Sequence, residues 1–381
     1  MKYADEFRDP VAAKGLLAAI ETVTNEIGAT AEKPVRIMEI CGGHTHAIFR
    51  YGLDKLTPKG LEFIHGPGCP VCVLPMTRVD ECVEIAEKPE VIFTTFGDAM
   101  RVPGTKKSLL QAKAEGADIR MVYSPLDALA LARKFPEREV VFFGLGFETT
   151  TPSTALTIQQ AAAEDIDNFT VFCNHITVPP PIKVLLDDPR MTLDGFVGPG
   201  HVSMVIGIEP YRFIAKDYGK PIVVAGFEPL DLLQSVLMVL EQIRDGRAEV
   251  ENQYSRIVPD AGNPASIAAC EDVYEPRESF EWRGLGEIDS SGLKIRNKYK
   301  AFDAEEKFGI GYATSTRFVP EQEGCACGEV MTGFIKPKQC PQFGKGCTPE
   351  VPLGALMVSS EGACAAYYQY GGAQLELEAT T

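Results

Sequence analysis

The chain has 381 residues, of which 45% are hydrophobic and 24% charged, and its formal net charge is −16. This composition is typical of a globular protein, and the acidic charge argues against nucleic-acid binding, which needs a basic surface. The sequence has no apolar run long enough for a membrane span, and its first ten residues lack the basic and then apolar pattern of a signal peptide. We therefore expect a soluble cytoplasmic protein of two or three domains.

The first predicted element is a helix that begins after Asp9. Asp9 is a suitable N-cap and Pro10 suits the first helical position. Apolar residues then recur at helical spacing as far as Gly28, which is typical of a helix C-terminus. We expect this helix, within residues 1–30, to pack its apolar face on the C-terminal domain.

From residue 31 to about 235 a short apolar run, ending in a turn, recurs eight times. The runs are Val35–Ile40, Leu61–His65, Val91–Phe96, Ile119–Tyr123, Val140–Phe143, Phe169–Cys173, Phe196–Val197 and Ile222–Ala225. Stretches of helical character lie between several of them, at Thr77–Glu87, Lys106–Glu115, Pro125–Lys134 and Thr154–Glu164, and Leu230–Asp245 follows the last. Strands that alternate with helices predict an α/β fold with parallel sheets.

We place these strands in two Rossmann-like α/β domains, at residues 31–135 and 136–235, because each range is close to the common size of a domain. After residue 235 the sequence changes, with more Pro, Gly and charge and a cysteine-rich end. Residues 236–381 are therefore predicted to form a third, mainly helical domain that carries an iron–sulfur site.

Eleven cysteines are many for a cytosolic chain. Cytosolic thiols are kept reduced, so clustered cysteines indicate metal binding or redox chemistry more often than structural disulfides. Three lie early in Gly-rich motifs and five lie in the last sixty residues: Cys41, Cys69 and Cys72, then Cys325, Cys327, Cys340, Cys347 and Cys364. Cys82, Cys173 and Cys270 stand alone and are interpreted as small buried residues.

The first cysteine motif, CGGHTH at 41–46, directly follows a predicted strand. Ligands of parallel α/β sheets bind beyond the carboxyl ends of the strands. Cys41 is therefore a candidate soft metal ligand, with His44 or His46 as its partner. A zinc site is the obvious rival, although no complete set of Cys and His ligands occurs at the usual spacing.

The second motif is the C-x-x-C of Cys69 and Cys72, after Gly66-Pro67-Gly68. Two thiols at this spacing can form a disulfide, and a nearby helix N-terminus can stabilise a thiolate. The residues between them, Pro70 and Val71, are not the pair typical of thioredoxin-like oxidoreductases. We favour a redox dithiol over half of a zinc site, because the sequence has no second C-x-x-C to complete the zinc site.

The cysteine-rich tail gives the strongest evidence in the sequence for a metal cluster. Four thiolates suit a 4Fe–4S cluster, and five are present. Zinc is again the alternative, but the C-x-x-C pairs of zinc sites are absent from the tail. We assign Cys325, Cys340, Cys347 and Cys364 as the ligands and leave Cys327 as the neighbour whose role is open.

Polar residues also follow the strands. All five histidines lie in or beside these turns: His44, His46, His65, His175 and His201. Any one of them alone would be interpreted as capping a loop. As a set, they are predicted to gather at a site. Glu148 and Glu228 occupy two Gly-Phe-Glu turns, where they serve either in proton transfer and positioning or as caps of the next helices.

The motifs together resemble the HypD family of hydrogenase maturation proteins. The resemblance rests on CGGHTH at 41–46, HGPGCPVC at 65–72, FCNHITVPPP at 172–181, GFVGPGHVS at 195–203, AGFEPLD at 225–231 and CTPEVPLGALMVSSEGACAAYYQY at 347–370. It implies one 4Fe–4S cluster and a complex with a HypC-type chaperone. That complex holds an iron that receives two cyanides and one carbon monoxide before transfer to the hydrogenase large subunit.

The resemblance also implies residue roles. Cys41 is the ligand of the iron, with His44 beside it, and Cys69 and Cys72 form the dithiol that passes reducing equivalents from the cluster. Cyanide arrives from a HypE-type partner as a thiocyanate, whose cleavage consumes two electrons that a dithiol can supply together. The alternatives are an iron–sulfur disulfide reductase that acts on a protein substrate, and a binding module in which the cluster is structural.

Overall fold

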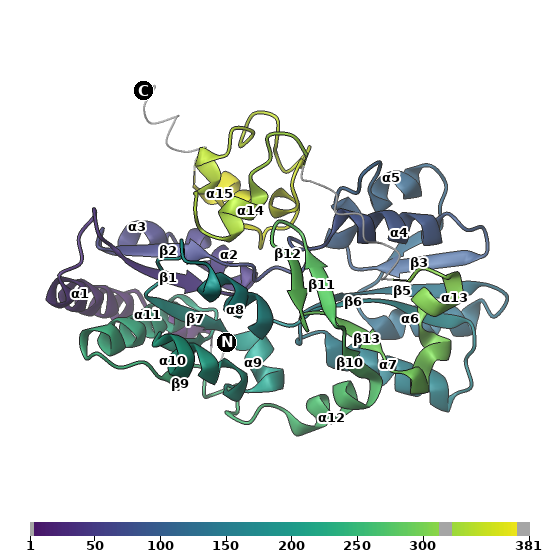
Figure 1. Cartoon of the computed structure of the whole chain (residues 1–381), viewed down its shortest axis with the longest axis horizontal. Coiled ribbons are helices and arrows are strands. Elements are labelled where there is room, and N and C mark those ends of the chain that lie inside the picture. The colour runs from purple at the N-terminus through teal and green to yellow at the C-terminus, as the bar shows by residue number, and fades with distance from the viewer. Residues whose placement is uncertain (1–3, 312–321, 372–381) are drawn as a thin grey trace.

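The computed structural model describes residues 4–311 and 322–371. Two parallel sheets with flanking helices lie side by side, and residues 322–371 lie across them at the top of Figure 1. The α/β fold class and the two parallel sheets predicted from the sequence are confirmed. No helix in the described ranges is long and apolar enough to cross a membrane.

Sheet A has five parallel strands in the order β2-β1-β7-β8-β9. The strands are β1 (Val35–Glu39), β2 (Leu61–His65), β7 (Gly195–Pro199), β8 (Ile222–Ala225) and β9 (Val250–Asn252). The helices of this half are α2 (Gly42–Arg50), α3 (Leu53–Leu56), α8 (Pro179–Asp187), α9 (Gly200–Ile206), α10 (Arg212–Tyr218) and α11 (Pro229–Arg244). Strand β1 lies inside the sheet, because Ile37 pairs with Phe63 of β2 on one side and with Gly195 of β7 on the other.

Sheet B has four parallel strands in the order β4-β3-β5-β6. They are β3 (Val91–Thr95), β4 (Ile119–Met121), β5 (Glu139–Gly146) and β6 (Phe169–His175). The helices of this half are α4 (Met76–Ala86), α5 (Leu109–Ala114), α6 (Pro125–Lys134) and α7 (Thr151–Ala163). Strands β3 and β6 are buried throughout, as expected for a parallel sheet covered on both faces.

All eight predicted apolar runs form strands, but the sheets do not follow the predicted ranges 31–135 and 136–235. The chain leaves sheet A after β2, builds all of sheet B with β3–β6, and returns to sheet A at β7. The expected boundary at residue 135 therefore falls inside sheet B. A buried strand is apolar on both faces whichever sheet it joins, so local pattern identifies strands and not their partners.

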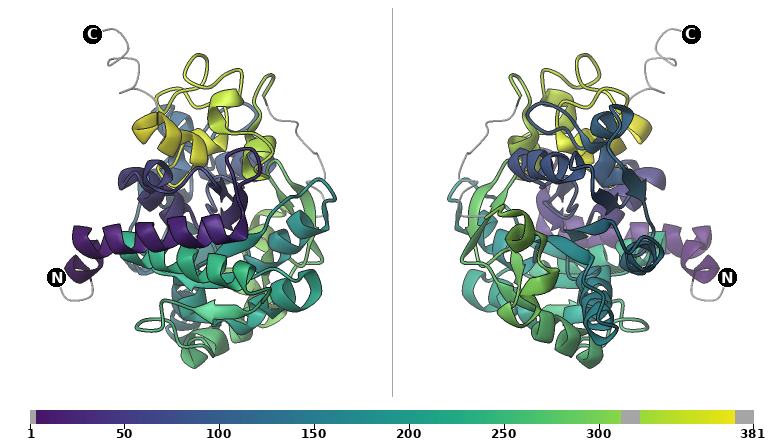
Figure 2. Two further views of the ribbon diagram at one scale, coloured as in Figure 1. Left: turned by 90° about the vertical axis from the view of Figure 1, so that its left-hand side faces the viewer. Right: turned by 90° about the vertical axis from the view of Figure 1, so that its right-hand side faces the viewer.

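Helix α1 (Pro10–Ile27) has the predicted caps: Asp9 accepts hydrogen bonds from the N–H groups of Val11 and Ala12, and Gly28 has a φ of 78°. The expectation that it packs on the C-terminal domain is wrong. It lies along α11, where Ile20 and Val23 share a hydrophobic core with that helix (Figure 2). The long apolar side of α11 faces both sheet A and α1, so α1 extends the sheet A half.

Residues 236–311 are not part of a helical third domain. They complete α11 and add β9 to sheet A, and they place α12 (Pro264–Val273) and α13 (Ala304–Phe308) against the sheet B half. Two antiparallel strand pairs lie between these helices: β10 (Tyr274–Pro276) with β13 (Leu293–Ile295), and β11 (Ser279–Trp282) with β12 (Gly286–Asp289). The predicted range 236–381 thus combines strands and helices of the two α/β halves with the separate tail.

We call residues 322–371 the tail module. It contains the short helix α14 (Cys327–Met331), the helix α15 (Ala363–Tyr370) and 3-10 turns at Pro337–Gln339 and Ala355–Met357. Helix α15 packs on α2 of sheet A, and the tail module lies over the space between the two sheets (Figures 1 and 2). It therefore covers the carboxyl ends of strands from both halves.

Candidate functional site

Cys41 lies between the end of β1 and the first turn of α2. Its N–H donates to Glu39 Oε2 at 3.0 Å, and its carbonyl accepts from the His44 N–H at 2.8 Å, so the backbone of the residue is fixed on both sides. The two glycines that follow have no space for a side chain. A Cβ on Gly42 would lie 2.5 Å from the Glu361 Cβ, and one on Gly43 would lie 2.9 Å from the Phe227 ring.

A buried carboxylate supports this loop. Glu39 is fully buried, and its Oε1 accepts from His65 Nδ1 at 2.8 Å and from the Thr45 hydroxyl, while Oε2 accepts from the Cys41 N–H. A buried carboxylate is tolerated only when donors satisfy it in this way. Glu39 thereby ties β1, β2 and α2 together directly beneath Cys41.

The C-x-x-C motif packs against the Cys41 loop. The Gly42 N–H donates to the Gly68 carbonyl at 3.0 Å, and a Cβ on Gly68 would lie 2.5 Å from the Cys41 Cα. The Cys72 N–H donates to the Cys69 carbonyl at 3.0 Å, which bends the motif into a turn with neighbouring thiols. Both cysteines are free and buried. Burial raises the pKa of Cys72 well above its usual value, and the Cys69 thiol raises this pKa further.

The five tail cysteines line one small, mainly apolar cavity together with residues such as Val330, Phe343 and Met357. The Sγ atoms of Cys325 and Cys327 are 3.3 Å apart. A Cβ on Gly354 would lie 2.2 Å from the Cys327 Sγ and 2.7 Å from the Cys325 Sγ, so this glycine closes the cavity on that side. The Leu353 N–H donates to the Cys347 Sγ at 3.4 Å.

The donor set of this cavity, five cysteine thiols, is of the kind that the predicted cluster needs. A 4Fe–4S cluster binds four thiolates at four separate irons, so its ligands surround a space and do not meet at a point. Within residues 4–311 and 322–371 no group of three or more His, Cys, Asp or Glu side chains is already arranged to hold a metal ion. Because the thiols of Cys325 and Cys327 adjoin, one of them is enough to complete a set of four ligands with Cys340, Cys347 and Cys364. The choice of ligands stays a prediction.

The tail module also touches both N-terminal cysteine motifs. A Cβ on Gly362 would lie 3.0 Å from the Cys72 Sγ. Cys327 is near enough to contribute to the raised pKa of Cys72, after burial, Cys69 and Glu361. Five cysteines belong to a single hydrophobic core: Cys69, Cys72, Cys327, Cys347 and Cys364. The tail cavity, the C-x-x-C turn and the Cys41 loop are therefore contiguous.

Cys41 opens into a cleft of about 470 Å³ between the two sheets. The cleft is lined by residues that follow strands of both halves and by the tail module, including Cys41, Asp98, Tyr123, Phe147, His201 and Glu361. Its position at the carboxyl ends of parallel strands is the one expected for a ligand site. Cys69 and Cys72 lie behind its wall, since Gly68, Pro70 and Val71 of their motif line the cleft and the two cysteines do not.

The polar groups of the cleft suit a cation. Burial raises the pKa of Cys41 well above its usual value, and the carboxylates of Glu361 and Glu39 raise it further. Burial also raises the pKa of Glu361, with smaller contributions from Asp98 and Glu39. A bound metal ion takes the thiolate and relieves this crowding of negative groups. Thiolate, carboxylate and imidazole are all donors for iron.

The five histidines do not form one cluster. His201 lines the cleft, and the Phe227 ring stacks on both His201 and His44, at centroid distances of 3.8 and 4.7 Å. His44 is fully buried, its Nε2 lies 3.3 Å from the Ala225 carbonyl, and burial lowers its pKa to about 4. His46 packs edge-on against Tyr370 of the tail module.

The remaining two histidines have other surroundings. His65 donates to Glu39 and contacts Tyr367 and Phe49. His175 is buried beside Tyr274, and burial lowers its pKa to about 4. The prediction that all five histidines share one site therefore fails for His175, which ends β6 of sheet B, whereas the other four follow strands of sheet A.

The two acidic candidates also differ. Glu148 is buried, accepts from the Val178 N–H at 3.0 Å through Oε1, and burial raises its pKa to about 7. Glu228 caps α11 in a reciprocal arrangement with Asp231 and forms a two-pronged ion pair with Arg8. The capping interpretation is thus confirmed for Glu228, and neither carboxylate lines the cleft.

The chain matches the family model described as HypD: Hydrogenase formation hypA family, over residues 12–371. It is 77% identical to the hydrogenase maturation factor HypD of Rhodobacter capsulatus, across 98% of this chain and 99% of the relative. It is 58% identical to that of Escherichia coli K12, across 97% and 98%, and 50% identical to that of Cupriavidus necator, across 97% of each chain.

The chain belongs to the HypD family.

The structure of this HypD-family chain adds residues that sequence reasoning missed. Glu39 holds the Cys41 loop, Glu361 packs on Gly42 and lines the cleft, and Phe227 lies between two histidines. The sequence offered a sign of the role of Glu361, since this residue lies three positions before Cys364 in one of the motifs quoted above. Glu39 carried none, because an acid at a strand end is ordinarily exposed to solvent.

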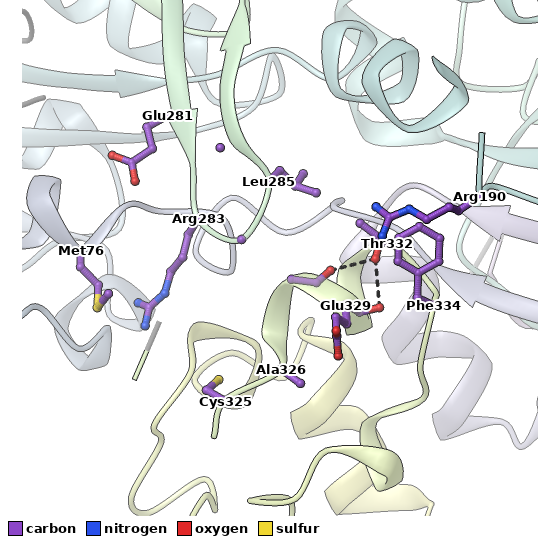
Figure 3. A pocket seen from close by; sticks show the side chains of 13 residues that line it. Met76, Arg190, Glu281, Arg283, Leu285, Cys325, Ala326, Glu329, Thr332 and Phe334 are labelled. Carbon is purple, nitrogen blue, oxygen red and sulfur yellow. Dashed lines mark hydrogen bonds between the residues drawn. The ribbon is translucent and has the colours of Figure 1, made fainter. Parts of the chain in front are cut away.

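A second pocket reaches one of the tail cysteines. A pocket of about 620 Å³ lies between the β11–β12 turn and α14, and Cys325 is one of its lining residues (Figure 3). Arg190, Arg283, Glu281 and Glu329 surround it, so two basic and two acidic side chains balance there. Cys325 is shared between this pocket and the cysteine cavity, which makes it a cavity thiol reachable from outside.

Proposed function

We propose that this chain, a hydrogenase maturation factor of the HypD family, is a redox-active scaffold that assembles the iron centre of nickel–iron hydrogenases. With a HypC-type chaperone it holds one iron while two cyanides and one carbon monoxide are added. A HypE-type partner donates the cyanide, and the finished centre passes to the hydrogenase large subunit. The observation that supports this best is the contiguity of tail cavity, C-x-x-C turn and Cys41 cleft.

In this proposal Cys41 binds the incoming iron, which is a cargo and not a resident cofactor. The Cys41 loop is rigid, because Glu39 and Gly68 both hydrogen-bond to it or to its neighbour. A rigid loop keeps the thiolate in the cleft while the small ligands are exchanged. His44 acts through packing, since it is buried against Phe227 and directs Nε2 toward the Ala225 carbonyl.

Cys69 and Cys72 would supply the electrons for cyanide release. Cleavage of the sulfur–carbon bond of a partner's thiocyanate yields cyanide and a thiolate, and it consumes two electrons. The dithiol provides both when it closes to a disulfide; of the two protons released, one neutralises the partner's thiolate and the other passes to solvent, while cyanide binds the iron as an anion. The Cys69–Cys72 turn suits this role because its two buried thiols already adjoin.

The tail cysteines would hold a 4Fe–4S cluster, which when bound would supply one electron at a time to reopen the disulfide. Cys327 is placed between the cavity and the C-x-x-C turn, since it lines the former and is near Cys72. This placement gives a short path for the electrons. It also explains why the tail module must dock on the α/β body.

The direct test is infrared spectroscopy of anaerobically purified protein, co-expressed with its HypC-type chaperone. We expect bands in the cyanide and carbonyl stretching region that vanish in Cys41→Ala. Cys270→Ala is the matched control, because Cys270 is a half-buried thiol near Thr151, outside the cleft. Absence of the bands from wild-type complex with intact iron–sulfur absorbance would contradict the scaffold role.

The dithiol role has a separate test. Cys69→Ala and Cys72→Ala should retain the cluster absorbance and lose ligation, seen as an iron-bound complex without cyanide bands. Normal hydrogenase maturation in either variant would refute the role. Turnover of a protein disulfide without chaperone or iron would instead support the alternative, an iron–sulfur disulfide reductase.

A further inference from the structure

A groove on the surface joins the sheet B half to the tail module. Its volume is about 410 Å³, and it lies between the loop after β3 and residues 349–353. We call it the basic groove and define it by Arg101, Lys106, Lys107, Leu110, Val351 and Leu353 among its lining residues. None of these residues has a role in the Cys41 cleft.

The charge of the basic groove is opposite to that of the molecule. The whole chain carries a formal charge of −16, whereas the groove is lined by Arg101, Lys106 and Lys107 against a single acid, Glu350. Arg101 is ion-paired with Asp98, and Lys107 is ion-paired with Glu87 and Glu115; these three acids lie outside the groove. Lys106 is exposed and has no ion-pair partner in the described part of the chain. A basic spot on an acidic protein focuses attraction for an acidic partner.

Apolar side chains occupy the same groove. Val351 is 63% exposed and Leu110 is 46% exposed, and both line the groove. Pro349 and Pro352 add further apolar surface. Apolar contacts bordered by charged side chains are typical of a protein-binding surface, whereas a site for a small anion needs convergent polar groups.

The floor of the groove adjoins the cysteine cavity. Leu353 lines the groove, and its N–H donates to the Cys347 Sγ at 3.4 Å. Gln322 also lines the groove, and its carbonyl accepts from the Cys325 N–H at 2.9 Å. Two of the cavity cysteines are thus one hydrogen bond away from residues that a bound partner would touch.

We propose that the basic groove is the docking site of a small acidic protein that carries one electron at a time, such as an acidic 2Fe–2S ferredoxin. This inference rests on the proposed function, because it supplies the reducing equivalents used there. Each docked carrier is oxidised by one electron and the tail cluster is reduced by one. Two successive encounters, with two protons from solvent, reopen the Cys69–Cys72 disulfide.

The pocket of Figure 3 is the less suitable entry. It reaches Cys325 directly, but its two arginines face two glutamates, and Arg190 is ion-paired with Asp188 and packed on Phe334. Balanced charge gives no long-range attraction for a carrier of either sign. The pocket of Figure 3 therefore shows, within the same molecule, what a charge-balanced surface near the cysteines looks like beside the basic groove.

The experiment follows the bleaching of iron–sulfur absorbance when the anaerobic full-length chain is mixed with a reduced acidic 2Fe–2S ferredoxin. Lys106→Glu should slow reduction by about tenfold at low ionic strength, and raising the salt concentration should slow the wild type similarly. Lys14→Glu, an equal change of charge on α1, should have a much smaller effect. Val351→Ser tests the apolar contact and should also slow reduction.

Dithionite separates the possible outcomes, since this small reductant needs no docking. If dithionite reduces every variant equally while Lys106→Glu and Val351→Ser alone slow the ferredoxin, the docking site is supported. Equal slowing by Lys106→Glu and Lys14→Glu, or reduction that is indifferent to salt, would overturn it and leave the proposed function standing. Loss of chaperone binding in Lys106→Glu with unchanged reduction would assign the groove to the chaperone. A chain that assembles no cluster refutes both proposals.

Discussion

The α/β body and the tail module are stabilised in different ways. In the body, strands such as β3, β6 and β8 are buried throughout, and helices such as α1, α5, α6 and α11 have defined caps. In the tail module α14 has five residues and α15 has eight, and much of the chain between them runs as turns around the cysteine cavity. Apolar burial specifies the body, whereas the tail module, under the proposed function, would be organised around the cluster that its cysteines bind.

The largest expected effect follows from that difference. Cys364→Ser should abolish most of the iron–sulfur absorbance and leave the tail module open to proteolysis, because a metal site that organises a small module also supplies its folding free energy. The body should keep its far-ultraviolet circular dichroism. Limited proteolysis with mass spectrometry would locate the cleavage sites.

Cys82→Ser is the control within the body. Cys82 is fully buried in the sheet B core, so its substitution should lower overall stability without changing the cluster absorbance. If Cys364→Ser unfolds the body as well, or if the tail module resists proteolysis without its cluster, the contrast between the two regions fails.

The next effect concerns the part of the body that holds Cys41. Glu39→Ala should lower the free energy of unfolding by about 3–5 kcal/mol, because it leaves the donors of His65, Thr45 and Cys41 buried without their acceptor. Urea denaturation measures this loss. The cluster absorbance should persist, since Glu39 lies outside the tail cavity. Glu62→Gln, which changes a half-exposed carboxylate paired with Arg36 and Lys336, should cost far less.

Glu39 also shows where prediction from the sequence ends. The run Val35–Ile40 identified a strand correctly, and the Cys41 motif was expected at its end. The burial of Glu39 depends on the register of β1 with β2, which sets Glu39 opposite His65. Register with a distant strand has no local signature, so the supporting carboxylate could not be predicted.

The tail shows the same limit in another form. The five cysteines were expected to gather, and they line one cavity. The close approach of Gly362 to Cys72 and of Glu361 to Gly42 depends on how the tail module docks on the body. Similarly, α1 was predicted with both caps but not its partner α11, because an apolar helix face does not specify what covers it.

A third effect depends on pH and is expected in the body alone. Burial raises the pKa of Glu148 to about 7 in the folded body, compared with 4.5 when exposed. The folded state therefore binds this proton more tightly, and stability falls as the pH rises from about 4.5 to 7. Glu148→Gln should remove this penalty, worth on the order of 3 kcal/mol at pH 8, and change little below pH 4.5.

Urea denaturation of wild type and Glu148→Gln at pH 5 and pH 8 checks this effect in the body. The iron–sulfur absorbance should be equal in both proteins at each pH, since Glu148 does not line the tail cavity. A stabilisation by Glu148→Gln that is larger at pH 5 than at pH 8 would contradict the sign.

The smallest expected effects compare one substitution at two glycines of the body. Gly68→Ala places a Cβ 2.4 Å from the Cys41 nitrogen, so the two cysteine motifs must separate, at a cost of about 1–3 kcal/mol. Gly15→Ala, within α1, meets nothing within 4 Å and should stabilise by about 0.5–1 kcal/mol through helix propensity. The midpoints of urea denaturation, at an unchanged dependence of the unfolding free energy on urea concentration, would measure both changes in stability.

Because Gly68 joins the Cys41 loop to the C-x-x-C turn, Gly68→Ala should also weaken the infrared bands of the iron centre, and Gly15→Ala should leave them unchanged. Equal behaviour of the two variants would show that the contact between the motifs tolerates movement, and would remove the rigidity assigned to the Cys41 loop.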